Sequence, residues 1–326
     1  MKKTVLATAI AALSTPAFAG GIDSGADLTL SGGMTTGYYN TSNTGSANND
    51  NFQVSDFMLE LSAEASEGVG FTAGFGTMAA ITVWDGGVNN SAYGYGFQYG
   101  WVTVAPMDGL SFEAGMLATN IGYEVANSYA NPHATIAGLW GAQPVYYPGA
   151  RVNYEMGDLG LYAEVNQAGG GSSEAWTVGA SGSVAGLDYA VSYRDGDQST
   201  NLLDIIVATS VAGIDVAANI DFTTLDNAAA NQDDSALGVA LYAATNVAGI
   251  DVPVRLEFLN DGTSGVYMGV DSATTFTVTP TYRFSDNTFV RAEFSLVNST
   301  NKIFRDENGV PQDSKTTFAI QAGYTF

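Results

Sequence analysis

Ionisable side chains in this chain are sorted by parity. Within the expected strands, charged residues tend to lie an even number of residues apart, as in Asp56 and Glu60 or in Arg255 and Glu257. Successive side chains of an extended strand point to opposite faces, so these charges share one face. Rings of carboxylates around a passage favour cations. The pattern therefore predicts an acidic face that could conduct cations.

The acids on this face outnumber the arginines, in agreement with a formal charge of −23. Such a charge argues against a nucleic-acid-binding surface, which needs basic residues. By the alternation, thirteen acids and five arginines belong to the face: Asp56, Glu60, Glu64, Glu113, Glu155, Glu164, Asp188, Asp204, Asp215, Asp221, Asp251, Glu257 and Glu293, with Arg151, Arg194, Arg255, Arg283 and Arg291.

Hydrolytic chemistry is the alternative use of these residue types. His133 is the single histidine, and no Gly-x-Ser-x-Gly nucleophile motif lies near it. A lone histidine is weak evidence for acid–base catalysis. We expect no enzyme and assign no catalytic, cofactor-binding or metal-binding residues. Cysteine is absent, so disulfides do not hold the fold.

The last segment, Thr316 to Phe326, indicates the element that positions these side chains. Phe318, Tyr324 and Phe326 share one parity with other apolar residues, and polar or small residues occupy the other. This period of two predicts a strand, and a strand of about 11 residues can cross a bilayer when it is tilted from the membrane normal. Because an open sheet edge cannot be satisfied in lipid, strands that span a membrane must close into a barrel.

The same alternation recurs along the chain and predicts about 16 strands. Short turns near residues 67, 108, 157, 186, 213, 249 and 286 alternate with longer polar loops, which is typical of outer-membrane barrels with short periplasmic turns. The fold class is therefore all-β, a transmembrane antiparallel up-and-down barrel. Pro253 and Pro280 lie inside expected strands and predict bulges or shifted strand bounds there.

A segment without alternation, residues 119–148, interrupts the pattern. Unstructured loops of that length are uncommon and are usually functional or disordered. This one contains Tyr123, Glu124, His133 and Trp140, which is too aromatic for a disordered linker. It would be the third outward loop.

The beginning of the chain predicts export. Met1, Lys2 and Lys3 precede an apolar run and an Ala-x-Ala site that ends at Ala19. Residues 1–19 are therefore predicted to be a cleaved signal peptide, and residues 20–326 to form a single barrel in the outer membrane of a Gram-negative cell.

The sequence resembles the outer-membrane porins, and most of all the OmpL-like β-barrel porin family. The residues that carry the resemblance are Phe112 to Met116, Thr119 to Glu124, Asn131, and Gly149 to Tyr154. It implies passive diffusion of small solutes and a third outer loop that folds into the lumen. It also implies that Phe318, Tyr324 and Phe326 act as the signal for the barrel-assembly machinery, and that the protein forms homotrimers among lipid and lipopolysaccharide.

We therefore predict a cation-preferring porin, because a barrel of about 16 strands leaves a water-filled lumen. Two alternatives remain open. One is a sugar-selective channel that uses Trp140, Tyr146 and Tyr147, and the other is a plugged structural or receptor barrel. The pore-lining candidates are Glu60, Glu113, Glu124, Arg151, Glu155, Glu164, Asp188, Arg194, Asp204, Asp221, Arg255, Glu257, Arg283, Arg291 and Glu293.

Overall fold

The computed structural model describes residues 28–47, 49–66, 68–84, 95–167, 174–196 and 200–326. The predicted signal peptide, residues 1–19, lies outside them. In these ranges no helix combines the length and the hydropathy needed to cross a membrane. Strands make up most of the described chain, in agreement with the prediction of an all-β protein.

The strands follow one another through the whole described chain, with two short 3-10 helices between β5 and β6. Their bounds are β1 (Leu28–Thr41), β2 (Asp50–Ser66), β3 (Val69–Met78), β4 (Gly96–Met107), β5 (Leu110–Ala118), η1 (Ser128–Ala130), η2 (Gly138–Ala142), β6 (Tyr146–Met156), β7 (Leu159–Gln167), β8 (Glu174–Val184), β9 (Leu187–Asp195), β10 (Thr200–Val211), β11 (Ile214–Leu225), β12 (Ser235–Val247), β13 (Ile250–Asn260), β14 (Ser272–Val278), β15 (Thr281–Ser285), β16 (Thr288–Ser299), β17 (Phe304–Arg305), β18 (Pro311–Gln312) and β19 (Ser314–Thr325).

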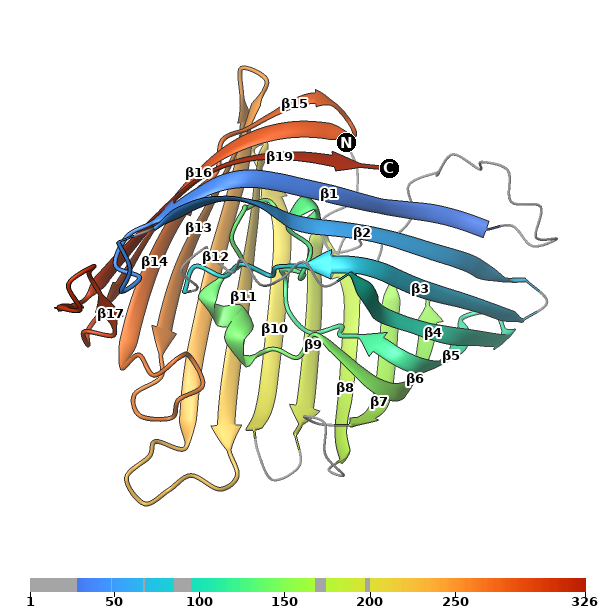
Figure 1. The fold of residues 1–326 in the computed structure, drawn as a ribbon. Helices are drawn as coiled ribbons and strands as arrows, with labels where there is room; N and C mark the ends of the chain where they lie inside the picture. The colour runs from blue at the N-terminus through green and yellow to red at the C-terminus, as the bar shows by residue number, and fades with distance from the viewer. Residues whose placement is uncertain (1–27, 48, 67, 85–94, 168–173, 197–199) are drawn as a thin grey trace.

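The sheet closes on itself (Figure 1). Each barrel strand pairs antiparallel with its neighbour along the chain, and β19 returns to pair with β1 from Gly33–Thr325 to Thr41–Thr317. Because β14 and β15 both pair with β13 and β16, they are two parts of one strand. The 17 described segments of the sheet thus form a barrel of 16 strands, as predicted, and β17 and β18 make a separate hairpin.

Pro253 and Pro280 explain where that one strand is divided. β13 pairs with β14 down to Val254 and with β15 again at Asp251, so Pro253 falls at the gap in the ladder. Pro280 lies in the same gap, between β14 and β15. The two residues that lack an amide hydrogen are therefore placed where no ladder bond is needed. Across the gap, Thr279 keeps the inward parity of Thr277 and Thr281, and its amide donates to the Pro253 carbonyl at 3.0 Å.

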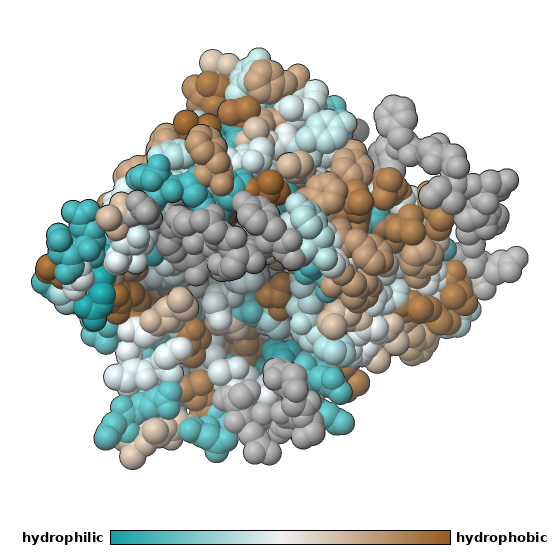
Figure 2. Space-filling model, viewed as in Figure 1, coloured by the Kyte–Doolittle hydropathy of each residue, from teal (hydrophilic) through white to brown (hydrophobic). Residues whose placement is uncertain are grey.

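The two faces of each strand differ as the alternation predicts. In β13, Leu256 and Phe258 are 40% and 48% exposed, while Arg255 and Glu257 between them are 0% and 1% exposed. Apolar side chains gather over the strands on the right of Figure 2, where Figure 1 places β3 to β5. Hydrocarbon outside the wall accounts for this sorting, because a charge there costs about 2–4 kcal/mol at mid-membrane for Arg or Lys.

The repeated Val-Ala-Gly-Leu/Ile-Asp units form three equivalent tight turns at one end of the barrel. Ala185, Ala212 and Ala248 have φ of 52°, 53° and 53°, and the glycines that follow have φ of 84°, 82° and 87°. Two successive residues with positive φ characterise the type I′ turn, whose twist matches that of a two-residue hairpin. These turns mark the periplasmic end of an outer-membrane barrel.

The orientation of the wall predicts how arginine is tolerated on its outer face. Leu256→Arg should lower the free energy of unfolding in lipid bilayers by about 2–4 kcal/mol, because Leu256 faces outward near mid-strand. The matched control is Val211→Arg, which faces outward at the end of β10 and should cost about 0–1 kcal/mol. Urea titration of both variants checks this, and equal costs would contradict the outward placement of Leu256.

Candidate pore constriction

The segment between β5 and β6 lies inside the barrel, where Figure 1 shows it in green behind the blue strands. Many of its residues are buried, among them Ile121, His133, Ile136 and Leu139, which are 1–3% exposed. It contains η1 and η2 and otherwise lacks regular structure. This agrees with the prediction of an in-folded loop. We call residues 119–145 the lumen loop.

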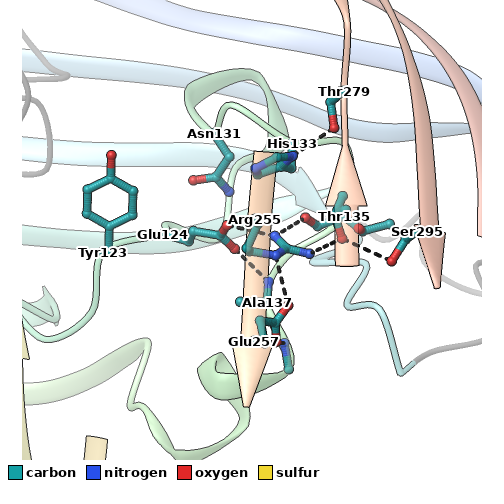
Figure 3. Close-up of polar contacts among 12 residues, drawn as sticks. Tyr123, Glu124, Asn131, His133, Thr135, Ala137, Arg255, Glu257, Thr279 and Ser295 are labelled. Atoms are coloured by element: carbon teal, nitrogen blue, oxygen red, sulfur yellow. Dashed lines mark hydrogen bonds and ion pairs between the residues drawn. The ribbon is translucent and has the colours of Figure 1, made fainter. Parts of the chain in front are cut away.

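An ion-pair cluster on β13 holds the middle of the lumen loop (Figure 3). The Arg255 guanidinium lies 2.7 Å from Glu124 of the loop and 2.8 Å from Glu257 of its own strand, and the latter contact is an ion pair outside hydrogen-bond geometry. Arg255 also donates to the Thr135 carbonyl at 2.9 Å. All three charged side chains are 0–2% exposed. Breaking such a buried cluster would leave an uncompensated charge.

The carboxylates of this cluster also accept backbone N–H groups of the loop. Ala137 N donates to Glu124 at 2.6 Å, and Gly138 N donates to Glu257 at 2.7 Å. Backbone groups of an irregular buried segment need partners, since an unpaired one is costly. Carboxylates of the barrel wall therefore supply the hydrogen-bond acceptors that neighbouring strands supply in a sheet.

Glu293 on β16 plays the same part for the neighbouring turn of the loop. It accepts Ala134 N at 2.6 Å, Thr135 N at 3.1 Å and the Thr135 hydroxyl at 2.6 Å. Thr279, which lies between β14 and β15, donates its hydroxyl to Glu293 at 2.9 Å. His133 Nδ1 lies 2.7 Å from that hydroxyl. Since the hydroxyl hydrogen goes to the carboxylate, His133 must be the donor in this contact.

A third group of contacts fixes η1 between β2, β16 and β19. Asp56 accepts Ser128 N at 2.7 Å. Arg291 donates to the Asn131 and Ser128 carbonyls at 2.7 and 2.8 Å and to the Gln321 side chain at 2.7 Å. The two ends of η1 are therefore held by opposite charges.

Carboxylates on β10 and β11 meet the two ends of the loop. Asp204 and Asp221 face each other in register and are both 0% exposed. Gln143 donates to Asp221 at 2.8 Å, Tyr123 N donates to Asn219 at 3.1 Å, and Asn219 also bonds Asp204. The loop is thus anchored to this wall through both acids and the amide between them.

The predicted pore-lining residues divide by depth. The buried ones that the structure brings together are Glu124, Arg255 and Glu257; Arg291 and Glu293, which both hold the loop; Asp204 and Asp221; and Arg151 and Glu164, which lie 2.8 Å apart. Arg151 also lies 3.2 Å from Glu113, which is partly buried. Glu60 is buried separately and accepts the Tyr99 hydroxyl at 2.7 Å.

The other candidates lie nearer the barrel ends and do not join these clusters. Glu155 is exposed, and Asp188 bonds Ser183 in its own hairpin. Arg283 pairs with Asp251 at 3.1 Å, with side chains 54% and 41% exposed. Arg194 contacts Asn166 at 3.1 Å and lies over the Tyr147 ring at 5.4 Å.

Several polar residues that hold the loop were not among the pore-lining candidates. They are Asp56, Ser128, Asn131, His133, Gln143, Asn219, Thr279 and Gln321. Asn219 and Gln321 share the parity of the charged face, so treating amides like acids would have found them. Thr279 likewise shares the parity of Arg283 in its strand, so extending the rule to hydroxyl side chains would have found it.

Aromatic residues of the loops pack on the wall. Tyr147 donates its hydroxyl to Glu164 at 2.6 Å, and the Tyr146 ring stacks on Tyr99 with centroids 5.0 Å apart. On the long-loop side, Trp84 stacks on Phe304 at 6.0 Å and belongs to an apolar cluster with Leu139. These rings stabilise the position of the loops within the barrel.

A cavity lies on the short-turn side of the lumen. It measures about 520 Å³ and is lined by residues of η1, β11, β12, β13, β15 and β16, including Tyr129, Asp215, Asp251, Arg283 and Phe289. We call it the vestibule. Among the residues that the structure describes, no group of three or more His, Asp or Glu side chains is placed to hold a metal ion.

A family model described as β-barrel porin-2, OmpL-like, matches residues 27–326. A comparison with curated protein sequences finds no match. Among solved structures, the fold is similar to a loop L8 deletion mutant of OmpT, an outer membrane protein of Vibrio cholerae, with a TM-score of 0.67 and 12% identity over 92% of this chain and 99% of that one.

Two further structures are similar. The outer membrane channel DcaP of Acinetobacter baumannii has a TM-score of 0.66 and 10% identity, covering 96% of this chain and 100% of that one. A mutant of the porin of Rh. blastica has a TM-score of 0.57 and 14% identity, covering 92% and 100%. At such low identity these similarities show the fold alone.

Removing one member of the Arg255 cluster should loosen the lumen loop. We expect Glu124→Ala to cost about 3–5 kcal/mol, because it leaves Arg255 short of one buried partner and the Ala137 amide without an acceptor. Amide hydrogen exchange at Ala137 and Gly138 measures this locally. Arg283→Ala breaks an exposed pair and should cost less than about 1 kcal/mol, so it is the control. Unchanged exchange at Ala137 in Glu124→Ala would show that the cluster does not hold the loop.

His133 predicts a pH dependence of stability. Burial, with Arg255 and Arg291 nearby, lowers the pKa of His133 well below its ordinary 6.5. As pH falls below about 6.5 the unfolded chain takes up a proton that the folded chain does not, so stability decreases by up to about 1.4 kcal/mol per pH unit. This loss continues until the pH reaches the folded pKa. Between pH 7 and 5, wild type should therefore lose about 2 kcal/mol more than His133→Gln in urea titrations. Parallel pH profiles would contradict the assignment.

Proposed function

The chain belongs to the OmpL-like β-barrel porin-2 family, and we propose that it forms a water-filled channel for passive diffusion of small hydrophilic solutes, with a preference for cations. Its fold is that of an outer-membrane porin-type barrel. The coarse function, a channel in the Gram-negative outer membrane, follows from that membership. Charge preference and the solutes carried are the parts that we propose.

The excess of acids on the lumen face carries the proposed cation preference. Among the described residues, nine carboxylates are buried within the barrel or its loops, against three guanidinium groups and Lys315. Three carboxylates nearer the short turns are exposed or partly exposed: Asp188, Asp215 and Asp251. The exposed Arg283 pairs with Asp251. A passage lined by one sign of charge between low-dielectric walls concentrates counter-ions.

The lumen loop supports a narrow channel rather than a wide one. It contacts β2, β10, β11, β13, β16 and β19 through the bonds described above, and it leaves many mid-height side chains buried. Small solutes are therefore the expected substrates. Of the three aromatic residues that could stack on sugars, Trp140, Tyr146 and Tyr147, the two tyrosines are engaged with the wall, which disfavours a sugar-selective channel.

A barrel closed by its own loop is the second candidate function, and the burial at mid-height favours it. In a closed structural or receptor barrel, planar bilayers would show no ion steps without a ligand. A porin gives steps in salt alone. The same recording therefore separates the two.

The partners follow from the membrane setting. We propose contacts with outer-membrane lipid and lipopolysaccharide, and recognition of Phe318, Tyr324 and Phe326 by the barrel-assembly machinery. Phe318 and Tyr324 face outward with 40% and 52% exposure, which suits a partner that approaches from lipid. Homotrimers are a further proposal, supported by the trimer form of OmpT of Vibrio cholerae.

The proposed preference predicts the sign of a reversal potential. With the purified protein in a planar bilayer and a tenfold KCl gradient, zero current should occur at the voltage that favours K⁺ over Cl⁻, because permeating ions meet more carboxylates than guanidinium groups. A Cl⁻-selective reversal potential would contradict the cation preference, and the absence of steps would favour the closed barrel. Asp215→Asn should reduce the K⁺ preference without abolishing the steps.

A further inference from the structure

The imidazole of His133 has one ring nitrogen without a partner. Its Nδ1 donates to the Thr279 hydroxyl at 2.7 Å, whereas Nε2 contacts no hydrogen-bond partner in the described part of the chain. The residue is 1% exposed. Burial and two arginines hold its pKa well below 6.5, so Nε2 is an unprotonated acceptor at neutral pH. A buried acceptor left unpaired is costly and calls for an explanation.

A small recess adjoins this nitrogen. It measures about 50 Å³ and is lined by His133 and Tyr123 of the lumen loop and by residues of β11 to β13, including Asp215, Tyr242 and Pro253. Thr279 lies beyond β13 from this recess, so the ring nitrogen opposite the Thr279 bond faces it. Figure 3 shows Thr279 on one side of the His133 ring and Tyr123 on the other.

The recess opens toward the periplasmic end of the barrel. Pro132, Asp215, Ala244 and Pro253 line both the recess and the vestibule of about 520 Å³, so the two cavities adjoin. A space of this size holds one or two water molecules, by the roughly 30 Å³ that a water occupies in the liquid, or one aminomethyl group. A solute in the vestibule could thus insert one small polar group as far as His133.

The groups that line the recess offer hydrogen-bond acceptors. Asp215 supplies a carboxylate that accepts Ser210, and no described lysine or arginine forms an ion pair with it. The rings of Tyr123 and Tyr242 lie with centroids 4.4 Å apart and their planes tilted by 39°, and aromatic rings attract cations. His133 Nε2 adds a neutral acceptor. An ammonium group carries three donors and no acceptor, which matches this set.

The nearby arginines are engaged with carboxylates. Arg255 lies between Glu124 and Glu257, and Arg283 pairs with Asp251. Two acids, Asp215 and Asp251, and two arginines, Arg283 and Arg291, line the vestibule, whereas Asp215 is the one carboxylate among the described residues that line the recess itself.

We propose that this recess is a binding subsite for a primary ammonium group, carried by a small organic cation that enters from the vestibule. The ammonium donates to His133 Nε2 and to the Asp215 carboxylate, and its charge lies against the Tyr123 and Tyr242 rings. The proposal rests on the proposed cation preference and narrows it to one class of cation.

His133 provides the test because it is the single histidine of the chain. The mature protein, refolded in detergent micelles with ¹⁵N-histidine, is titrated with n-butylammonium chloride while the Nε2 chemical shift is followed. A saturable shift is expected. Tetramethylammonium has the same charge but no N–H donor and should give no saturable shift at the same concentrations.

The turn repeat offers a matched pair of variants. Asp215→Asn should weaken butylammonium binding about tenfold, the loss typical of one charge-assisted hydrogen bond. Asp188→Asn removes the same residue of the same repeat in the neighbouring hairpin, where it bonds Ser183 but does not line the recess, and should change binding less than about twofold.

Three results would overturn the proposal. No saturable shift with butylammonium means that the recess holds water only. Equal responses to both ammonium ions mean that charge alone attracts them. Equal effects of Asp188→Asn and Asp215→Asn mean that the rim acts as a diffuse negative surface. The titration measures binding in micelles, where no ion crosses a membrane. The ammonium subsite can therefore be disproved while the reversal potential still shows K⁺ preference, and the K⁺ preference can be disproved while the subsite still binds butylammonium.

Discussion

Backbone amides of a loop inside the barrel need hydrogen-bond acceptors, and this requirement shapes the lumen. The lumen loop has little regular structure, so its N–H groups cannot pair within a helix or a ladder. Carboxylates of the wall accept them instead. Glu293 accepts two loop amides, Glu257 accepts one, and Asp56 accepts the first amide of η1. Each such bond to a charged acceptor contributes about 1.5–3 kcal/mol.

The acidic face therefore has two roles that are separated by depth. At mid-height, acids are buried and hold the loop, with Arg255 and Arg291 placed to balance them and to bond loop carbonyls. Toward the short turns, Asp215 and Asp251 remain in contact with water. The charges that set the shape of the passage are thus largely different from the charges that a solute meets first. On the outside of the wall, hydrocarbon imposes the complementary rule and leaves apolar residues there.

The sequence predicts those parts of the fold that depend on side-chain alternation and on turn-forming residues. Alternation predicted the 16 strands, the parity of residues such as Arg255 and Leu256, and a long segment without strands after β5, and the resemblance to porins implied that this segment folds inward. The sequence could not show which acids face water, because their burial depends on the path of an irregular loop through the lumen. Glu124 and Glu257 are far apart in sequence and meet only through Arg255. The inward direction of Thr279 follows from its parity, but its bonds to His133 and Glu293 depend on the path of the loop and on a neighbouring strand, which the pattern of one strand does not reveal.

The account depends on the lumen loop limiting the passage, and single-channel conductance tests that most directly. Residues 121–144 are replaced by a short Gly-Ser linker, and the refolded barrel is compared with wild type in the same salt. The account predicts larger conductance steps without the loop, since the loop occupies the middle of the barrel and its removal widens the aqueous path. Steps of the same size in both proteins would contradict it.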